Sequence, residues 1–414
     1  MFEFGRDLRK LFERARESDD LGWLELVAAN LVETEARSLS IDAGRVSCAK
    51  PFDGWMRAST LWREHARRTG FRTSLDRAAG SASDAGRHAS TPDQRAAAAL
   101  EALELRLLTF DLFGGPERLR TAEIDLSGIE PQRQPTRAWA GSLKGRLTAR
   151  QARLNGDPAA LRDAAAVLDD AVAHSRGLSR TMVSDLRLER AALSLEIGLM
   201  HRDVALLDRA GRDLRAMVED AAPEQRPLTR ARALTLAAAG LSALATLAGD
   251  DGAVLNGRAL FDAAADQFTP DHSPLDWVAI QLARAEDGHT ALSVMIQSEA
   301  LTLESGLILG ALARERRTSI EVALAEATRD IQGLATLAVM IKARLLHPSI
   351  APIDWAGEQI GLIRIARARA RLTGVEPAAI GLMAAEAALT AREQGAILLA
   401  EKAESAVLEQ HASA

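Results

Sequence analysis

The residues best suited to binding chemistry in this chain are arginines near its C-terminal end. Arg364, Arg367, Arg369 and Arg371 crowd one Ala-rich stretch, and positions 364, 367 and 371 share one face of a helix. Guanidinium groups on one face can bind an acidic peptide or a terminal carboxylate through charge-assisted hydrogen bonds. The favoured alternative is an exposed face whose arginines pair with nearby Glu and Asp, each pair contributing about 0–1 kcal/mol.

Motifs for catalysis or metal binding are absent from the sequence. Its histidines are scattered, and none forms the His-Glu-x-x-His pair of a helical zinc site. The sequence has neither a phosphate-binding glycine loop nor the Gly-x-Ser-x-Gly turn that presents a nucleophilic serine. The lone Cys48 has no family signature around it. We therefore expect no catalytic residue, no metal site and no cofactor, and the chain is predicted not to be an enzyme.

The composition indicates a helical protein and gives no support for nucleic-acid binding. Tyr is absent and aromatic residues make up only 4%, so Ala and Leu must fill the core. These side chains suit closely packed helices and suit large sheets poorly. A net charge of −6 provides no strongly basic face for nucleic acid. One cysteine and the lack of a signal segment in Met1–Arg16 predict a cytoplasmic location.

Helical segments alternate with short turns along most of the chain. In Asn155-Gly156-Asp157-Pro158, glycine ends one helix and Asp-Pro opens the next. Equivalent turns are separated by 44, 42, 46 and 47 residues and lie at Gly70, Gly114, Gly156, Arg202 and Gly249. A period of about 40 residues made of two helices is typical of helical-repeat proteins. The pattern predicts an all-α fold, an α-solenoid of about eight stacked antiparallel helix hairpins.

The two ends of the predicted solenoid are less regular. Residues 1–45 are predicted as an N-terminal helical pair, whose second helix runs from Leu21 to Ser38. Residues 46–414 form the predicted solenoid, with a C-terminal capping helix over 394–410. Between turns at Gly288 and Gly374 the register has two candidates, Arg316–Ser319 and Gly333.

The first stretch, Met1–Arg16, has the pattern of an amphipathic helix. Its apolar side is formed by Phe2, Phe4, Leu8, Leu11, Phe12 and Ala15. The favoured interpretation is that this helix caps the first repeat or forms the seam of a homodimer. The alternative is that it lies on an anionic membrane surface, although acidic residues dilute its basic side.

Two later helices begin with related sequences, Pro274-Leu275-Asp276-Trp277 and Pro352-Ile353-Asp354-Trp355. Proline pre-sets the first helical turn, aspartate complements the helix dipole, and tryptophan anchors packing. This opening resembles a bacterial group of tetratricopeptide-like repeats, although the hairpins here are longer than the usual 34-residue pattern. The resemblance implies binding of a protein or peptide, and it implies no catalytic residues.

The sequence therefore predicts a cytoplasmic adaptor that binds a partner protein or peptide, an acidic one included, on a concave face. The candidate binding residues are Arg364, Arg367, Arg371, Gln281, Arg284 and Gln359. Two alternatives stay open: a regulator that binds a small ligand or peptide inside the superhelix, and a membrane-surface scaffold that uses the N-terminal helix.

Overall fold

The fold is known from a computed structural model. The structure describes residues 21–284, 288–375, 377 and 379–408. Within these residues the chain forms 18 α-helices, one short 3-10 helix and no strand. The predicted all-α class is therefore confirmed. The expected amphipathic helix over Met1–Arg16 lies outside the described residues, and the predicted boundary at residue 45 stays a prediction.

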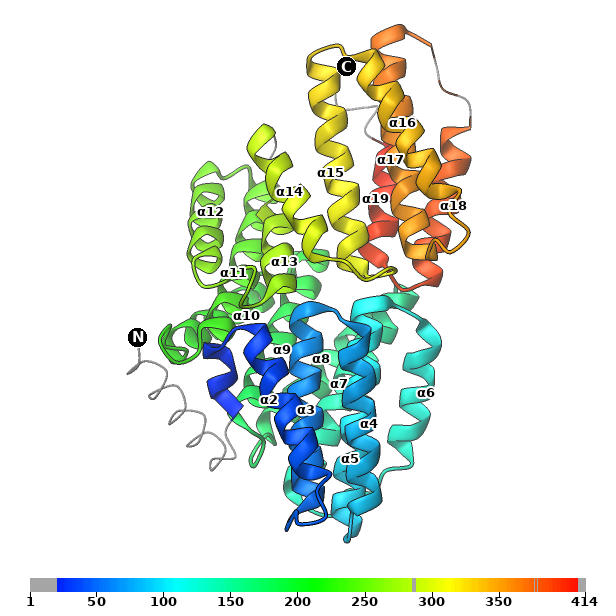
Figure 1. Cartoon of the computed structure of the whole chain (residues 1–414). Coiled ribbons are helices and arrows are strands. Elements are labelled where there is room, and N and C mark those ends of the chain that lie inside the picture. The colour runs from blue at the N-terminus through cyan, green and yellow to red at the C-terminus, as the bar shows by residue number, and fades with distance from the viewer. Residues whose placement is uncertain (1–20, 285–287, 376, 378, 409–414) are drawn as a thin grey trace, which may run out of the picture. The chain divides into compact units, whose positions relative to one another are not determined.

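The helices follow one another through short connections (Figure 1). Their bounds are η1 Leu21–Leu26, α2 Ala29–Ala43, α3 Pro51–Thr69, α4 Arg72–His88, α5 Pro92–Phe113, α6 Pro116–Ser127, α7 Gln134–Asn155, α8 Pro158–Ala173, α9 Arg180–His201, α10 Val204–Asp220, α11 Pro227–Ala248, α12 Asp251–Ala265, α13 Pro274–Arg284, α14 His289–Leu301, α15 Ile308–Ala327, α16 Ile331–Leu345, α17 Pro352–Thr373, α18 Ile380–Glu393 and α19 Ile397–Leu408. Below, the odd-numbered helices α3 to α17 are called first helices, and the even-numbered helices α4 to α18 are called second helices.

The chain divides into two compact units. Unit 1 comprises Met1–His65, Asp76–Glu104 and Glu123–Ser273. Unit 2 comprises Ala66–Leu75, Leu105–Ala122 and Pro274–Ala414. The division passes through α3, α4, α5 and α6, so each of these helices contributes residues to both units.

Within each unit, every helix from α7 onward packs against the next helix in the chain. In unit 1 these contacts run from α7 to α12, and α9 also contacts α7 and α11. In unit 2 they run from α13 to α19, and α15 also contacts α13 and α17. Alanine and leucine fill the cores, as between α7, α8 and α9, where Ala149, Leu161, Ala164, Leu168 and Leu186 are buried together.

Three hairpins of unit 1 share one turn geometry. The residue that ends the first helix is left-handed at Gly156, Arg202 and Gly249, with φ of 63°, 52° and 66°. An aspartate follows each of them, and its Oδ1 accepts hydrogen bonds from two backbone amides in the first turn of the next helix. The aspartate thereby supplies the N-cap that a new helix needs.

A turn of the same kind lies in unit 2, between the predicted turns at Gly288 and Gly374. Arg329 is left-handed with φ of 55°, and Asp330 caps α16 by accepting a hydrogen bond of 2.7 Å from the Gly333 amide. The candidate turn at Arg316–Ser319 is wrong, because α15 continues through these residues to Ala327. The second candidate, Gly333, lies inside the first turn of α16.

The predicted helix from Leu21 to Ser38 is wrong in its first part. Leu21–Leu26 forms the 3-10 helix η1, Ala28 is extended, and α2 begins only at Ala29. The physical reason is that Glu25 hydrogen-bonds to residues at the start of α11, so this segment follows the surface of unit 1. The C-terminal capping helix begins later than expected, since α19 starts at Ile397 after a left-handed Gly395.

Helix α11 is long enough and apolar enough to cross a membrane, judged by length and composition alone. One such helix is weak evidence for a membrane span, because a core helix can have the same length and composition. In unit 1 it packs against α9, α10 and α12.

Candidate functional site

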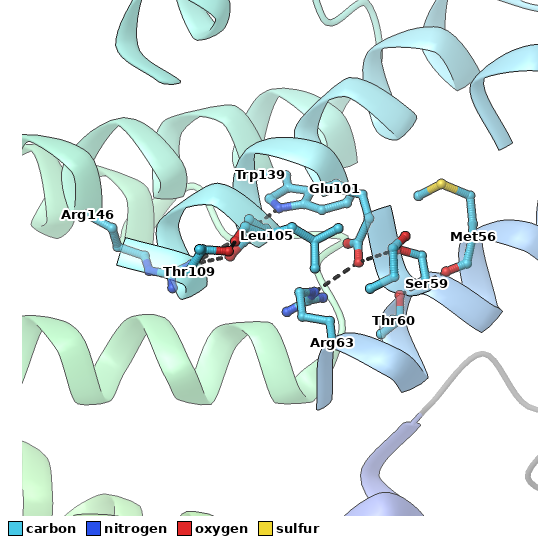
Figure 2. A network of polar contacts seen from close by, with 11 residues as sticks. Met56, Ser59, Thr60, Arg63, Glu101, Leu105, Thr109, Trp139 and Arg146 are labelled. Carbon is cyan, nitrogen blue, oxygen red and sulfur yellow. Dashed lines mark hydrogen bonds and ion pairs between the residues drawn. The ribbon is translucent and has the colours of Figure 1, made fainter. Parts of the chain in front are cut away.

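Two buried carboxylates on α5 form the centre of a polar cluster in unit 1. Glu101 is fully buried, and its Oε1 accepts hydrogen bonds from Ser59 Oγ at 3.1 Å and Arg63 Nε at 2.9 Å. Figure 2 shows Ser59 and Arg63, both on α3, directed toward this carboxylate. The other oxygen of Glu101, Oε2, has no hydrogen-bond partner among the described residues.

Glu104 lies one helical turn further along α5 and is only 5% exposed. It accepts a hydrogen bond from Trp139 Nε1 at 3.0 Å and two from Arg146, at 2.9 and 2.7 Å. Burial acts to raise the pKa of Glu104, but charge attraction from Arg146 and Arg63, with these hydrogen bonds, outweighs burial and lowers it. The carboxylate is therefore held ionised at neutral pH and is a poor candidate for a general base.

The same kind of pair joins α7 to α9. Arg150 binds Glu189 through both carboxylate oxygens, with NH2 to Oε2 at 3.1 Å, and Arg153 Nε donates to Glu196 Oε2 at 2.7 Å. The bonds from α3 to α5, from α5 to α7 and from α7 to α9 join residues 38, 42, 39 and 43 positions apart in sequence. Ionic contacts therefore link successive first helices of unit 1.

The arginines predicted to bind a partner lie on α17 in unit 2. Arg364 Nε donates to Glu315 Oε1 on α15 at 2.9 Å, and Lys402 Nζ lies 3.1 Å from Oε2 of the same buried carboxylate. Arg371 binds both oxygens of Glu326, also on α15. These side chains face charges from neighbouring helices of their own unit.

Arg367 has a different environment from the other two arginines. It is 6% exposed, and its guanidinium donates to the backbone oxygens of Ala406 and Val407 at the end of α19. The cation thus satisfies carbonyl groups that a helix C-terminus leaves without partners, an arrangement that the helix dipole also favours.

The remaining predicted binding residues are placed on different first helices. Gln281 and Arg284 are partly exposed on α13, and Gln359 is partly exposed on α17. Helices α13 and α17 both contact α15. Among the described residues, no three His, Cys, Asp or Glu side chains are grouped so that they could hold a metal ion.

Sequence reasoning missed the cluster around Glu101 and Glu104. Its signal was present, because Arg63 and Arg146 lie 38 and 42 residues from their carboxylate partners, close to the spacing of the turns. What the arrangement can do is position helices, since each carboxylate already has a cation. No protein-family model matches the chain, and no curated protein matches it.

Proposed function

We propose that the chain is a tetratricopeptide-like α-solenoid that binds a partner protein or peptide and catalyses no reaction. The observation that carries this proposal is the row of ion pairs between alternate helices in each unit, such as Glu104 with Arg146 and Glu315 with Arg364. A stack of hairpins brings the first helices of neighbouring hairpins side by side, which is where such pairs would form.

Two further features support a stacked arrangement. Alternate helices pack directly on one another, as α9 does on α11 in unit 1 and α15 does on α17 in unit 2. Left-handed turn residues at Arg329 and Gly374, and the positive-φ Gly288 at the N-cap of α14, continue the spacing seen at Gly156, Arg202 and Gly249. A period of about 40 residues would follow, somewhat longer than that of tetratricopeptide repeats.

A protein or peptide is the ligand class that suits such a stack. Repeat proteins present extended concave surfaces, and one ligand along them contacts several repeats. Gln281 and Gln359 are the strongest candidate contacts, because each is partly exposed on a first helix and a side-chain amide both donates and accepts hydrogen bonds. Arg364, Arg367 and Arg371 would contribute indirectly by holding α17 against α15 and α19.

The test is a cross-linking pull-down with the full chain, followed by affinity measurement for the protein recovered. A Gln281→Ala/Gln359→Ala variant should weaken binding about tenfold, since losing two interfacial hydrogen-bonding groups costs about 1–2 kcal/mol. Gln332→Ala, at an exposed position on the second helix α16, is the matched control and should leave affinity unchanged. Recovery of no partner, together with a tightly bound small molecule in the purified protein, would contradict the proposal.

A further inference from the structure

A buried glutamate near the start of the described chain binds a helix 200 residues away within unit 1. Glu25 on η1 is 4% exposed. Its Oε1 accepts hydrogen bonds from Arg226 Nε and NH2, at 3.0 and 2.7 Å, and from Thr229 Oγ1 at 2.6 Å. Its Oε2 accepts one from the backbone amide of Thr229 at 2.7 Å.

These donors belong to the N-terminal end of α11, which has no cap of its own. Arg226 occupies the N-cap position, and its side chain makes no capping hydrogen bond. Glu25 therefore satisfies an amide of the first turn of α11 and places a negative charge at the positive end of the helix dipole. Arg226 also donates to Ser184 on α9 at 3.0 Å, which ties α9 into the same cluster.

Further contacts fasten the rest of this segment. Leu24 and Val27 are buried, and η1 packs on α9 and α11. At the end of the segment, the Ala29 amide donates to the Asp271 carbonyl oxygen at 3.1 Å. Residues 21–29 therefore join the first described helices of unit 1 to its last ones, although Leu26 stays 42% exposed.

We propose that residues 21–29 are a clasp that closes unit 1 on itself and that opens as one element while α7 to α11 stay folded. The reason is that four hydrogen bonds from the start of α11 converge on the single carboxylate of Glu25, so they form or break together, and the segment itself contains only a short 3-10 helix. Short segments outside the long packed helices open at a lower free energy than those helices do. This inference does not depend on the identity of any partner.

The experiment is hydrogen–deuterium exchange on the full chain with Glu25→Gln. Glutamine keeps the shape but removes the charge and presents an NH2 group to one of the donors. The Thr229 and Ala29 amides, which bond to Glu25 and to Asp271, should exchange at least ten times faster, while amides in the middle of α11 should change less than twofold. Glu33→Gln is the matched control, since Glu33 lies on α2 in an exposed pair with Arg37.

Two results would overturn the clasp. Unchanged exchange at Thr229 and Ala29 would show that Glu25 does not hold the segment, and equal acceleration throughout α7 to α11 would show only a loss of global stability. Thr229→Ala is the second, milder variant, because it removes one hydroxyl donor and keeps the amide. It should accelerate the same two amides by a smaller factor and leave the middle of α11 unchanged.

Discussion

Arg146 on α7 holds Glu104 on α5 through both carboxylate oxygens, at 2.9 and 2.7 Å, and both side chains are largely buried. Two charges removed from water are stable only when they are well paired, because the desolvation cost of each must be offset by the other. The pair therefore makes the register of α5 against α7 specific, since a shifted helix would leave a buried charge without its partner.

Glu104→Gln should lower the free energy of unfolding of unit 1 by about 2 kcal/mol at pH 7, because it removes the carboxylate that binds Arg146 most closely and leaves that cation facing the more distant Glu189, whose Oε2 lies 3.9 Å from Arg146 Nε. The folded-state pKa of Glu104 lies below its ordinary value of 4.5, so its contribution is complete above pH 4.5. As the pH falls through the lower folded-state pKa, that contribution is lost. The difference between wild type and variant should therefore shrink below pH 4.5, as measured by urea unfolding followed by tryptophan fluorescence.

The control for this charge change is Glu219→Gln, at an exposed position on α10 in the same unit. It should change the free energy of unfolding by less than about 0.5 kcal/mol at every pH. A difference between wild type and Glu104→Gln that stayed constant from pH 7 to pH 3 would show that the charge of Glu104 is not the source of the stabilisation.

Five of the turns could be predicted from the sequence because a left-handed glycine marks each of them, at Gly70, Gly114, Gly156, Gly249 and Gly374. Arginine gives no compositional signal for a left-handed turn, so the sequence indicates Arg202 only through its spacing from Gly156 and Gly249. Arg329 lies where the sequence register offers two other candidates, so its turn could not be predicted. The polar run Arg316–Ser319 has the composition of a turn, but it is helical and belongs to α15. At this point Gly361, which has no side chain, lets the α17 backbone lie close to the Thr318 side chain of α15. Tertiary packing decides such positions, and local sequence does not contain it.

The arginine cluster on α17 could be found from the sequence, but its partners could not. Glu315 lies 49 residues before Arg364, and that offset depends on how α15 and α17 align. The segment around Glu25 was harder still, because its partners Arg226 and Thr229 lie 201 and 204 residues away. Contacts over such distances follow from how unit 1 closes, which no local pattern records.

Gly114→Ala should destabilise unit 2 by about 3 kcal/mol. Gly114 is left-handed with φ of +69°, and a Cβ there would overlap the backbone oxygen of Gln394, which also accepts a hydrogen bond from Gly115. The left-handed strain accounts for about 1–2 kcal/mol and the overlap for the rest. Gly374→Ala is the control, since it has φ of +70° and open space, and should cost only the strain. Equal losses in urea unfolding would show that the contact with Gln394 is not tight.

Arg202→Gly should stabilise unit 1 by about 0.5 kcal/mol. Arg202 occupies the left-handed position that glycine occupies at 156 and 249, so the change removes strain, partly offset by the greater freedom of glycine in the unfolded chain. Arg212→Gly, at an exposed position inside α10, should instead destabilise by about 1 kcal/mol. Thermal unfolding should therefore give shifts of opposite sign, and a decrease for both variants would contradict the assignment of strain to Arg202.

Arg364→Ala and Arg371→Ala should differ sharply although both remove an arginine from α17. Glu315, the partner of Arg364, is 1% exposed, so the variant leaves a buried carboxylate with Lys402 as its one remaining cation among the described residues and should cost about 3 kcal/mol. Arg371 is exposed and Glu326 is partly exposed, so losing that pair should cost about 1 kcal/mol or less. Urea unfolding of the two variants measures the difference. If the two losses were equal, burial of Glu315 would not be what makes the contact between α15 and α17 strong.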